Sequence, residues 1–210
     1  MKLCYVTDRK TLAGPAEGQA RGLLRTIARV SESGVDWIQI REKDLCGGEL
    51  ARLAGEARRS APGDLRILLN DRLDVALAAG ADGVHLGEQS LPAKEAKRLA
   101  TERKGADRFM VGVSAHSLGS VVEAQANGAD YVLFGPVFPT PSKLVYGRPQ
   151  GVERLAAACQ AVSIPVLAIG GITVENAREC LLAGAAGIAA IRLFQEAGDV
   201  AAVVRALRGT

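Results

Sequence analysis

The segment VDWIQIREKD, residues 35–44, begins as a buried strand and ends in charged residues. Gln39, Arg41 and Lys43 stand at alternate positions, and alternate side chains of a strand point to the same side of a sheet. An amide followed by two cations at this spacing could line the mouth of an anion-binding site. A solvated loop after a strand would show the same pattern. The residues at the ends of the other strands are therefore needed to choose between a loop and an anion-binding site.

Polar residues follow most of the other apolar runs as well. In chain order they are Asn70 and Asp71, His85 to Glu88, Ser114 and His116, Thr140, Ser142 and Lys143, Gly170 and Gly171, and Arg192 after Ile191. The glycine pair is expected to offer backbone N–H groups to an anion, with Thr173 as the N-cap of the next helix. Hydrogen bonds to charged groups contribute about 1.5–3 kcal/mol each. The set therefore predicts a pocket for a diphosphate or for two phosphorylated substrates.

A regular alternation of strand and helix patterns positions these residues. The expected strands are residues 3–7, 36–40, 66–69, 83–86, 109–113, 131–135, 164–170 and 187–191. Segments between them, such as 17–33 and 174–184, repeat apolar residues at three and four positions, which is typical of helices. This alternation predicts βα units with a parallel sheet.

A weak internal repeat favours closure of that sheet. The pentapeptides GVDWI, GADGV, GADYV and GAAGI each place a helix-ending glycine before every second strand. We therefore predict an α/β fold, an eight-stranded parallel (β/α)8 TIM barrel, as a single domain over residues 1–210. An open doubly wound sheet is the alternative, and no G-x-G-x-x-G motif follows the first strand to support it.

Composition narrows the class of protein and its partners. The chain is 48% hydrophobic and 23% charged, with a net charge of +3, which does not favour nucleic acid as a partner. Four cysteines without C-x-x-C spacing indicate neither a zinc site nor a disulfide framework. The polar first residues and the lack of a long apolar run predict no signal peptide and no membrane partner. We expect a cytoplasmic protein.

Six motifs in this order make most of the chain resemble the thiamine phosphate synthase family and the related thiazole tautomerases. They are YVTDR (5–9), VDWIQIREK (35–43), NDRLDVALAAGADGVHLG (70–87), GVSAHS (112–117), GADYVLFGPVFPTPSK (128–143) and AIGGIT (168–173). The resemblance implies the same barrel fold. It also implies the coupling of a hydroxymethylpyrimidine diphosphate to a thiazole phosphate, or its carboxylate, to give thiamine phosphate and pyrophosphate.

The resemblance further implies roles for individual residues. The pyrimidine diphosphate would be held by Gln39, Arg41, Lys43, Asn70 and Lys143, with Ser114 assisting the pyrimidine or its leaving group. The thiazole phosphate would be surrounded by Thr140, Pro141, Ser142, Gly170, Gly171, Ile191 and Arg192. Ser114, His116 and Lys143 are the candidate catalytic residues. Asp71 would bind a Mg²⁺ ion that bridges diphosphate oxygens, and Ser90 stands at the position of the second metal ligand.

Two departures from the family pattern keep other functions open. Ser90 replaces an aspartate, although Glu88 could compensate, and Ile191-Arg192 replaces a Val-Ser pair. A thiazole tautomerase, which uses a histidine at the position of His116 for proton transfer, is the first alternative. A non-catalytic phosphate-binding module is the second. His116 could also be a helix-start histidine and His85 a satisfied core histidine, and a homodimer is possible.

Overall fold

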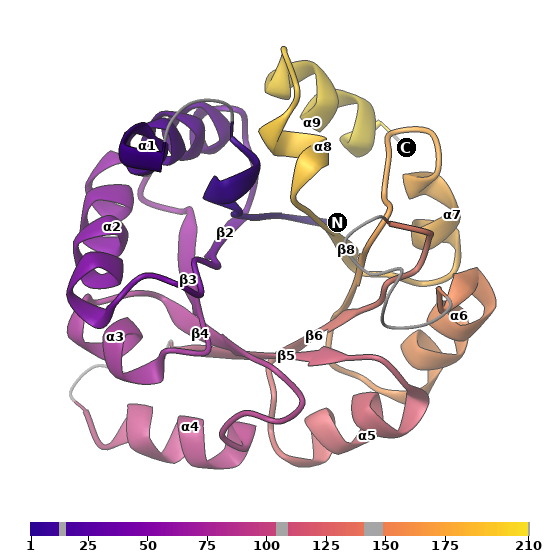
Figure 1. The fold of residues 1–210 in the computed structure, drawn as a ribbon. Helices are drawn as coiled ribbons and strands as arrows, with labels where there is room; N and C mark the ends of the chain where they lie inside the picture. Colours follow the sequence, from indigo (N-terminus) through magenta and orange to yellow (C-terminus); the bar gives the residue numbers. More distant parts are fainter. Residues whose placement is uncertain (13–15, 104–108, 141–148, 210) are drawn as a thin grey trace.

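Strands and helices alternate along the chain and close into a barrel, with the helices forming an outer ring (Figure 1). The computed structural model describes residues 1–12, 16–103, 109–140 and 149–209. The strands in these ranges are β1 (Lys2–Val6), β2 (Trp37–Ile40), β3 (Arg66–Asn70), β4 (Gly83–Leu86), β5 (Met110–Ala115), β6 (Tyr131–Phe134), β7 (Val166–Ile169) and β8 (Gly187–Ala190). The helices are η1 (Arg9–Thr11), α1 (Ala16–Glu32), α2 (Gly47–Ser60), α3 (Leu73–Ala78), α4 (Ala93–Thr101), α5 (Leu118–Ala126), α6 (Gly151–Ala161), α7 (Ala177–Leu182), α8 (Arg192–Gln195) and α9 (Val200–Arg208).

Every strand pairs in parallel with its neighbours in the sequence, and β8 returns to β1. The closing pair aligns Lys2 with Gly187 and Tyr5 with Ala190. The predicted eight-stranded TIM barrel is confirmed, and the open-sheet alternative is wrong. Strand β5 runs on to Ala115, further than expected, because Ser114 and Ala115 still pair with β6. Ser114 is therefore held by the sheet and does not lie on a loop.

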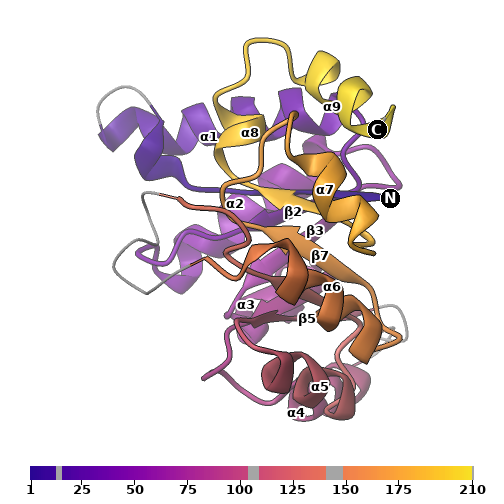
Figure 2. The same ribbon diagram turned by 90° about the vertical axis from the view of Figure 1, so that its right-hand side faces the viewer.

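The apolar residues form two packed regions, one inside the barrel and one around it. The interior holds Cys4, Trp37, Leu68, Tyr131 and Leu167, with several smaller residues. A larger cluster consists of residues from the strands and from the surrounding helices. Figure 2 shows these helices around the barrel from the side. The two regions follow from the alternation of side chains along each strand, since a strand in this barrel is buried on both faces.

The four glycines of the internal repeat end helices, as the sequence predicts. Gly34, Gly80, Gly128 and Gly184 all have positive φ angles, between 66° and 96°. The residue after Gly80 donates its N–H to the carbonyl of Ala76, which closes a Schellman motif that a residue with a Cβ would strain. Each glycine thus turns the chain from a helix into an even-numbered strand.

Three of these repeats also carry an aspartate that fixes the beginning of the preceding strand. Asp36 accepts the Leu3 N–H at 2.8 Å, Asp82 that of Ile67 at 2.7 Å, and Asp130 that of Val111 at 2.7 Å. A cation pairs with each carboxylate, namely Lys2 and Arg208 with Asp36, Arg58 with Asp82, and Lys97 with Asp130. In the fourth repeat Ala186 stands at this position.

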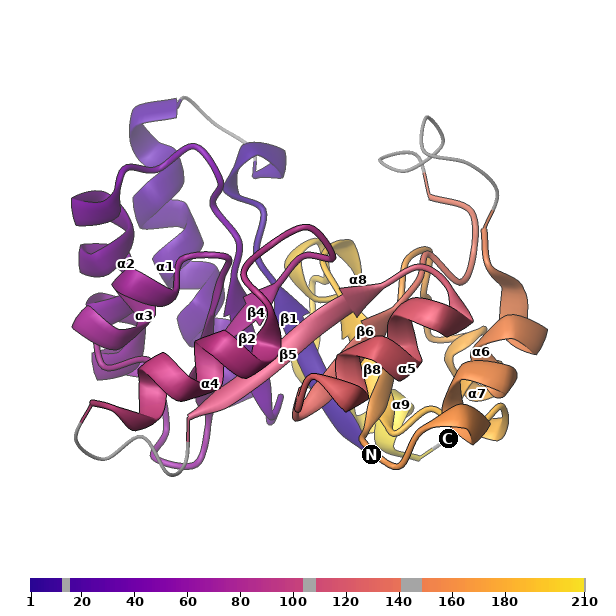
Figure 3. The same ribbon diagram turned by 90° about the horizontal axis from the view of Figure 1, so that it is seen from below.

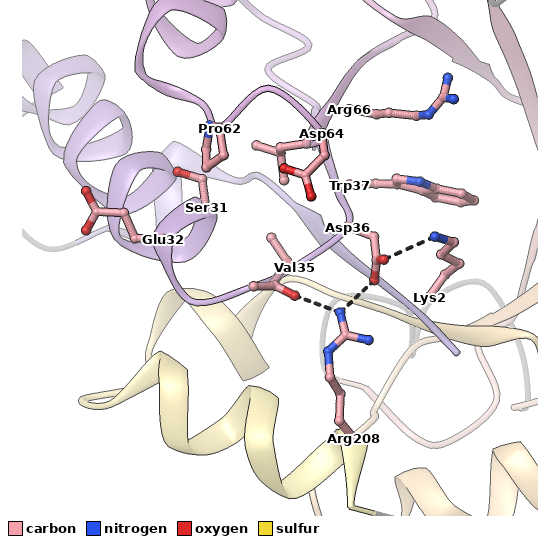
Figure 4. Close-up of a pocket in the computed structure, with 12 residues that line it drawn as sticks. Lys2, Ser31, Glu32, Val35, Asp36, Trp37, Pro62, Asp64, Arg66 and Arg208 are labelled. Atoms are coloured by element: carbon pink, nitrogen blue, oxygen red, sulfur yellow. Dashed lines mark hydrogen bonds and ion pairs between the residues drawn. The ribbon is translucent and has the colours of Figure 1, made fainter.

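These strand starts lie at one end of the barrel, which also holds both chain termini (Figure 3). A cavity of about 450 Å³ opens there between β1, β2, β3 and the end of α9. Figure 4 shows the side chains of Lys2, Trp37 and Arg66 in a row along it, with Asp36 joined to Lys2 and Arg208. The carboxyl ends of the strands, where the sequence places its candidate site, lie at the opposite end.

Asp36 should stabilise the fold in a pH-dependent way. Burial opposes its ionisation, but the Leu3 N–H, Lys2 and Arg208 outweigh burial and lower its pKa. The ionised carboxylate therefore contributes stability that is present at neutral pH and lost as the pH falls below about 4, through the folded-state pKa. Asp36→Asn should reduce the free energy of unfolding at pH 7 by about 1 kcal/mol, measured by urea denaturation.

Asp64→Asn is the matched control, because Asp64 lines the same cavity but is exposed. It should change the free energy of unfolding by less than about 0.5 kcal/mol. A loss for Asp36→Asn that stayed constant down to pH 2 would contradict the electrostatic explanation.

Candidate active site

The structure brings candidate residues from neighbouring strands together at the carboxyl end of the barrel. Gln39 Nε2 at the end of β2 donates to Asn70 Oδ1 at the end of β3, over 3.1 Å. Asn70 lies beside His85 of β4, and His85 Nε2 lies 2.9 Å from Ser114 Oγ of β5. One continuous line of hydrogen-bonded or adjacent polar side chains therefore crosses four strands.

The alternating charges after β2 divide into two groups with different tasks. Glu42 is buried and accepts three donors, Thr7 Oγ1 at 2.6 Å, the Arg9 N–H at 3.1 Å and the Arg9 guanidinium at 2.9 Å. Asp44 binds the same guanidinium through both oxygens, at 2.7 and 2.8 Å. Glu42 and Asp44 thus connect the loop after β1 to the loop after β2 through hydrogen bonds and ion pairs.

The cations of the same segment are left for other partners. The backbone N–H of Arg41 donates to Thr7 Oγ1 at 2.9 Å. Within the described residues, no ion pair involves the side chain of Arg41, Lys43 or Arg192. The interpretation of this segment as a plain solvated loop does not account for a buried glutamate that holds its backbone in place.

Gln39 carries a buried polar atom that its surroundings leave unsatisfied. Its side chain is 2% exposed, and Oε1 has no hydrogen-bond partner among the residues that the structure describes. If the side-chain amides of both Gln39 and Asn70 were flipped, Gln39 Oε1 would gain a donor but Gln39 Nε2 would lose its acceptor. One buried polar atom of Gln39 would still lack a partner. A buried polar atom without a partner costs about 1–3 kcal/mol, so this position suits a ligand that supplies the partner.

His85 is a satisfied core histidine, as one reading of the sequence expects, and one of its partners is a candidate catalytic residue. Its Nδ1 lies 3.0 Å from the hydroxyl of Tyr131, and its Nε2 contacts Ser114. Burial lowers the pKa of His85 to about 3, a shift that the negative charge of Asp71 opposes and the positive charge of Arg41 increases. The ring is therefore neutral, and its nitrogens donate one hydrogen bond and accept one.

The two candidate metal ligands are adjacent in the structure. Asp71 follows β3 in a left-handed backbone conformation with φ 63°, and its Oδ1 accepts a hydrogen bond from Ser90 Oγ. Glu88, the possible substitute, accepts the His116 N–H at 2.8 Å and so binds the start of α5. No cluster of three His, Cys, Asp or Glu side chains able to hold a metal ion occurs among the described residues. One carboxylate and one hydroxyl therefore lie together at this position.

His116 joins the end of β5 to the end of β6. Its Nδ1 donates a hydrogen bond to the carbonyl oxygen of Gly135, because a carbonyl oxygen can only accept. Its backbone N–H contacts Glu88 Oε1 and Ser120 Oγ at the beginning of α5. These contacts match the alternative of a helix-start histidine.

The glycine pair after β7 needs to be glycine for steric reasons. Gly170 and Gly171 have φ angles of 98° and 66°, and a Cβ on Gly171 would lie 2.5 Å from the Pro139 carbonyl oxygen. The expectation for Thr173 is wrong in detail, since α7 begins at Ala177 with Asn176 as its N-cap. Thr173 and Asn176 instead bond each other's backbone N–H and so cap the turn before the helix.

Arg192 lies at the start of α8, just after Ile191, and reaches the loop after β6. Its guanidinium donates to Thr140 Oγ1 at 3.2 Å, and Thr140 is buried. The predicted site residues Pro141, Ser142 and Lys143 lie outside the described residues. The described part of the region that the resemblance assigns to the thiazole phosphate therefore has a cation, a hydroxyl and the glycine pair.

Sequence reasoning missed several residues that position this end of the barrel. Gln195 of α8 is buried and binds Tyr5, the backbone of Asp8 and Thr11. Thr7 and Glu42 were likewise not assigned a role. The motif YVTDR contains Thr7 and Arg9, which donate to the Glu42 carboxylate. The sequence gives no sign, however, that a charged residue next to two cations is buried.

Comparisons with known proteins show which family the chain is similar to. The family model described as thiamine monophosphate synthase matches residues 3–194. The chain is 44% identical to the thiamine-phosphate synthase of Methanocella arvoryzae over 195 residues, covering 91% of this chain and 90% of that protein. It is 40% identical to the thiamine-phosphate synthase of Chlorobium limicola over 208 residues, covering 99% and 92%. The solved structure of thiamine phosphate pyrophosphorylase from Pyrococcus furiosus matches with a TM-score of 0.83 and 36% identity, covering 99% of this chain and 94% of that one.

Removing the buried carboxylate at position 42 should destabilise the protein strongly. Glu42→Gln would remove one of the charged partners of the Arg9 guanidinium. The N–H groups of that guanidinium would then lie against a neutral amide. We expect a loss of about 3 kcal/mol in the free energy of unfolding, measured by urea denaturation. Asp44→Asn, which alters the exposed partner of the same arginine, is the control and should cost at most about 1 kcal/mol. Equal losses in the two variants would show that burial of Glu42 is unimportant.

Proposed function

The chain belongs to the thiamine monophosphate synthase family and is a transferase with thiamine-phosphate synthase function, and we propose how its residues share that reaction. The match to the family model and to relatives along nearly the whole chain confirms the resemblance inferred from the six motifs. The substrates we assign to it are a pyrimidine methyl diphosphate and a thiazole phosphate. None of the helices in the described part of the chain is long and apolar enough to cross a membrane.

The single observation that carries the residue assignment is the unsatisfied atom of Gln39. A pyrimidine that bears an amino group offers the hydrogen-bond donor that Gln39 Oε1 lacks. Asn70 holds the Gln39 amide in place from the neighbouring strand. We therefore assign the bottom of the mouth, at Gln39 and Asn70, to the pyrimidine ring.

We assign the diphosphate to the cations above that ring. Arg41 and Lys43 follow Gln39 at alternate positions, and the hydrogen bonds of the Glu42 carboxylate to Thr7 and Arg9 fix the backbone between them. A guanidinium binds phosphate oxygens in a forked geometry and an ammonium binds them as a point charge. Lys143, which lies outside the described residues, is kept as a further diphosphate ligand on the resemblance alone.

We propose that Mg²⁺ takes part with Asp71 as its protein ligand and Ser90 beside it. The donor set fits this ion, because Mg²⁺ commonly binds through one or two carboxylates and completes its shell with substrate phosphates and water. When bound, the ion would neutralise negative charge on the diphosphate leaving group. The contact between Ser90 and Asp71 supports this position, since both oxygens lie together.

The thiazole phosphate is assigned to the opposite side of the mouth. Arg192 lies there with Thr140, and the glycine pair after β7 brings bare backbone close to the loop after β6. Ile191, which packs onto the interior cluster, would contact the ring. The phosphate would then be held by one guanidinium, a hydroxyl and backbone N–H groups.

The residues so placed support a substitution in which the leaving group departs first. Arg41 and Lys43 stabilise the negative charge that develops on pyrophosphate, and Ser114 donates a hydrogen bond to the pyrimidine or to the departing group. The thiazole nitrogen then attacks the methylene carbon. No strong base is needed at any step, because a ring nitrogen with a lone pair requires no deprotonation.

The tautomerase alternative is not supported. The relatives with 40–44% identity are thiamine-phosphate synthases, and His116 is used to join β5, β6 and α5. We assign His116 a positioning role on these contacts. Because the proposed substrates are phosphorylated biosynthetic precursors, we propose the cytoplasm as the compartment.

Pyrophosphate release tests the assignment of Gln39. With Mg²⁺ and both substrates, the wild-type protein should release pyrophosphate, and Gln39→Met should raise the KM for the pyrimidine diphosphate about tenfold. The KM for the thiazole phosphate serves as the internal control and should stay unchanged. Absence of pyrophosphate release in the wild type would overturn the function, whereas equal changes in both KM values would overturn only the role of Gln39.

The magnesium requirement tests the assignment of Asp71 and Ser90. Ser90→Asp places two carboxylates together, so the metal-free variant should be less stable, and Mg²⁺ should raise its melting temperature more than that of the wild type. The same variant should reach half-maximal activity at a lower Mg²⁺ concentration. Glu88→Gln is the control and should leave this concentration unchanged. A shift with Glu88→Gln and none with Ser90→Asp would place the ion at Glu88 instead.

A further inference from the structure

Tyr131 crosses the interior of the barrel from β6 toward β4. Its side chain is fully buried, and its ring packs against Trp37 with a centroid distance of 4.8 Å. Gly112 makes room for it, because a Cβ at that position would lie 2.0 Å from the Tyr131 ring. The phenol hydroxyl thereby reaches His85 Nδ1 at 3.0 Å, below the mouth of the barrel.

The hydrogen bonds of this group have a preferred direction. A buried phenol must give its proton to an acceptor, and His85 Nδ1 is the one acceptor paired with the Tyr131 hydroxyl among the described residues. If Nδ1 accepts, the hydrogen of the neutral imidazole is on Nε2, which then donates to Ser114 Oγ at 2.9 Å. The reverse direction would leave the buried phenol proton without an acceptor.

We propose that Tyr131, acting through His85, orients the Ser114 hydroxyl as a hydrogen-bond donor toward the substrate. Ser114 accepts from His85 on one side, so its own proton points to a second acceptor. Its side chain is partly exposed at the mouth, in line with Gln39 and Asn70. Tyr131 and His85 are positioning residues in this arrangement, and the inference rests on the proposed role of Ser114 at the pyrimidine diphosphate.

The arrangement removes a freedom that an isolated serine hydroxyl has. A serine on the surface can donate or accept by rotating its proton. Ser114 instead meets its ligand with the proton already directed, and preorganised donors stabilise developing negative charge without reorganising during the reaction. Ser114 therefore prefers an acceptor, such as a ring nitrogen or a phosphate oxygen, over a donor.

A double-mutant cycle in the full-length enzyme tests the coupling. Tyr131→Phe should lower kcat/KM for the pyrimidine diphosphate about tenfold, because Ser114 loses its fixed orientation. In the Ser114→Ala background the same substitution should change kcat/KM by less than about twofold. Equal effects in both backgrounds would overturn the proposal. Tyr5→Phe, which removes another buried phenol hydroxyl that bonds to Gln195, is the matched control and should leave kcat/KM unchanged.

The histidine tautomer provides a second test, which is read in the wild-type protein. The chain has two histidines, so ¹⁵N spectra of histidine-labelled protein contain few ring signals, and His116→Gln identifies those of His85. We expect the hydrogen of His85 on Nε2, and a hydrogen on Nδ1 would overturn the proposal. Failure of the proposed function is distinguishable, because the wild type would then release no pyrophosphate while the tautomer could still be read.

Discussion

Closure of the sheet between β8 and β1 is the constraint on which the site depends. A parallel strand leaves its backbone groups unpaired at an edge, and the pairing of residues 2–5 with residues 187–190 removes both edges at once. This closure turns eight strand ends into a ring. The hydroxyl of Tyr5 can donate to Gln195, although 190 positions separate the two residues in the chain, because the closure places β1 beside β8.

A buried carboxylate explains why the segment after β2 alternates in charge. Glu42 is stable inside the protein because three donors surround it, and those donors come from the loop after β1. The same interaction fixes the backbone between Arg41 and Lys43, whose side chains stay available to a ligand. Opposite charges in adjacent positions thus have different roles, since the acids hold the loop and the cations are the groups we assign to the ligand.

The sequence allowed much of this to be predicted. Periodicity and the glycine repeat gave the strand order and the helix ends, because a residue after a helix with positive φ is nearly always glycine. The line from Gln39 to Asn70 and Ser114 followed from their places at strand ends. The burial of Glu42, the contact between Tyr131 and His85 and the cap at Asn176 could not be predicted. Each depends on which side chain of another strand or turn lies opposite, and periodicity carries no such information.

The aspartates at the strand starts have a consequence for how this scaffold tolerates change. Asp36, Asp82 and Asp130 secure the barrel at one end, while the groups assigned to the ligands occupy the other, a full strand length away. Residues such as Ser90 and Arg192 can therefore differ from the family pattern without disturbing the anchors of the sheet. An engineer who wished to change the substrate could exchange the loops that follow the strands and keep the aspartate contacts at the strand starts intact.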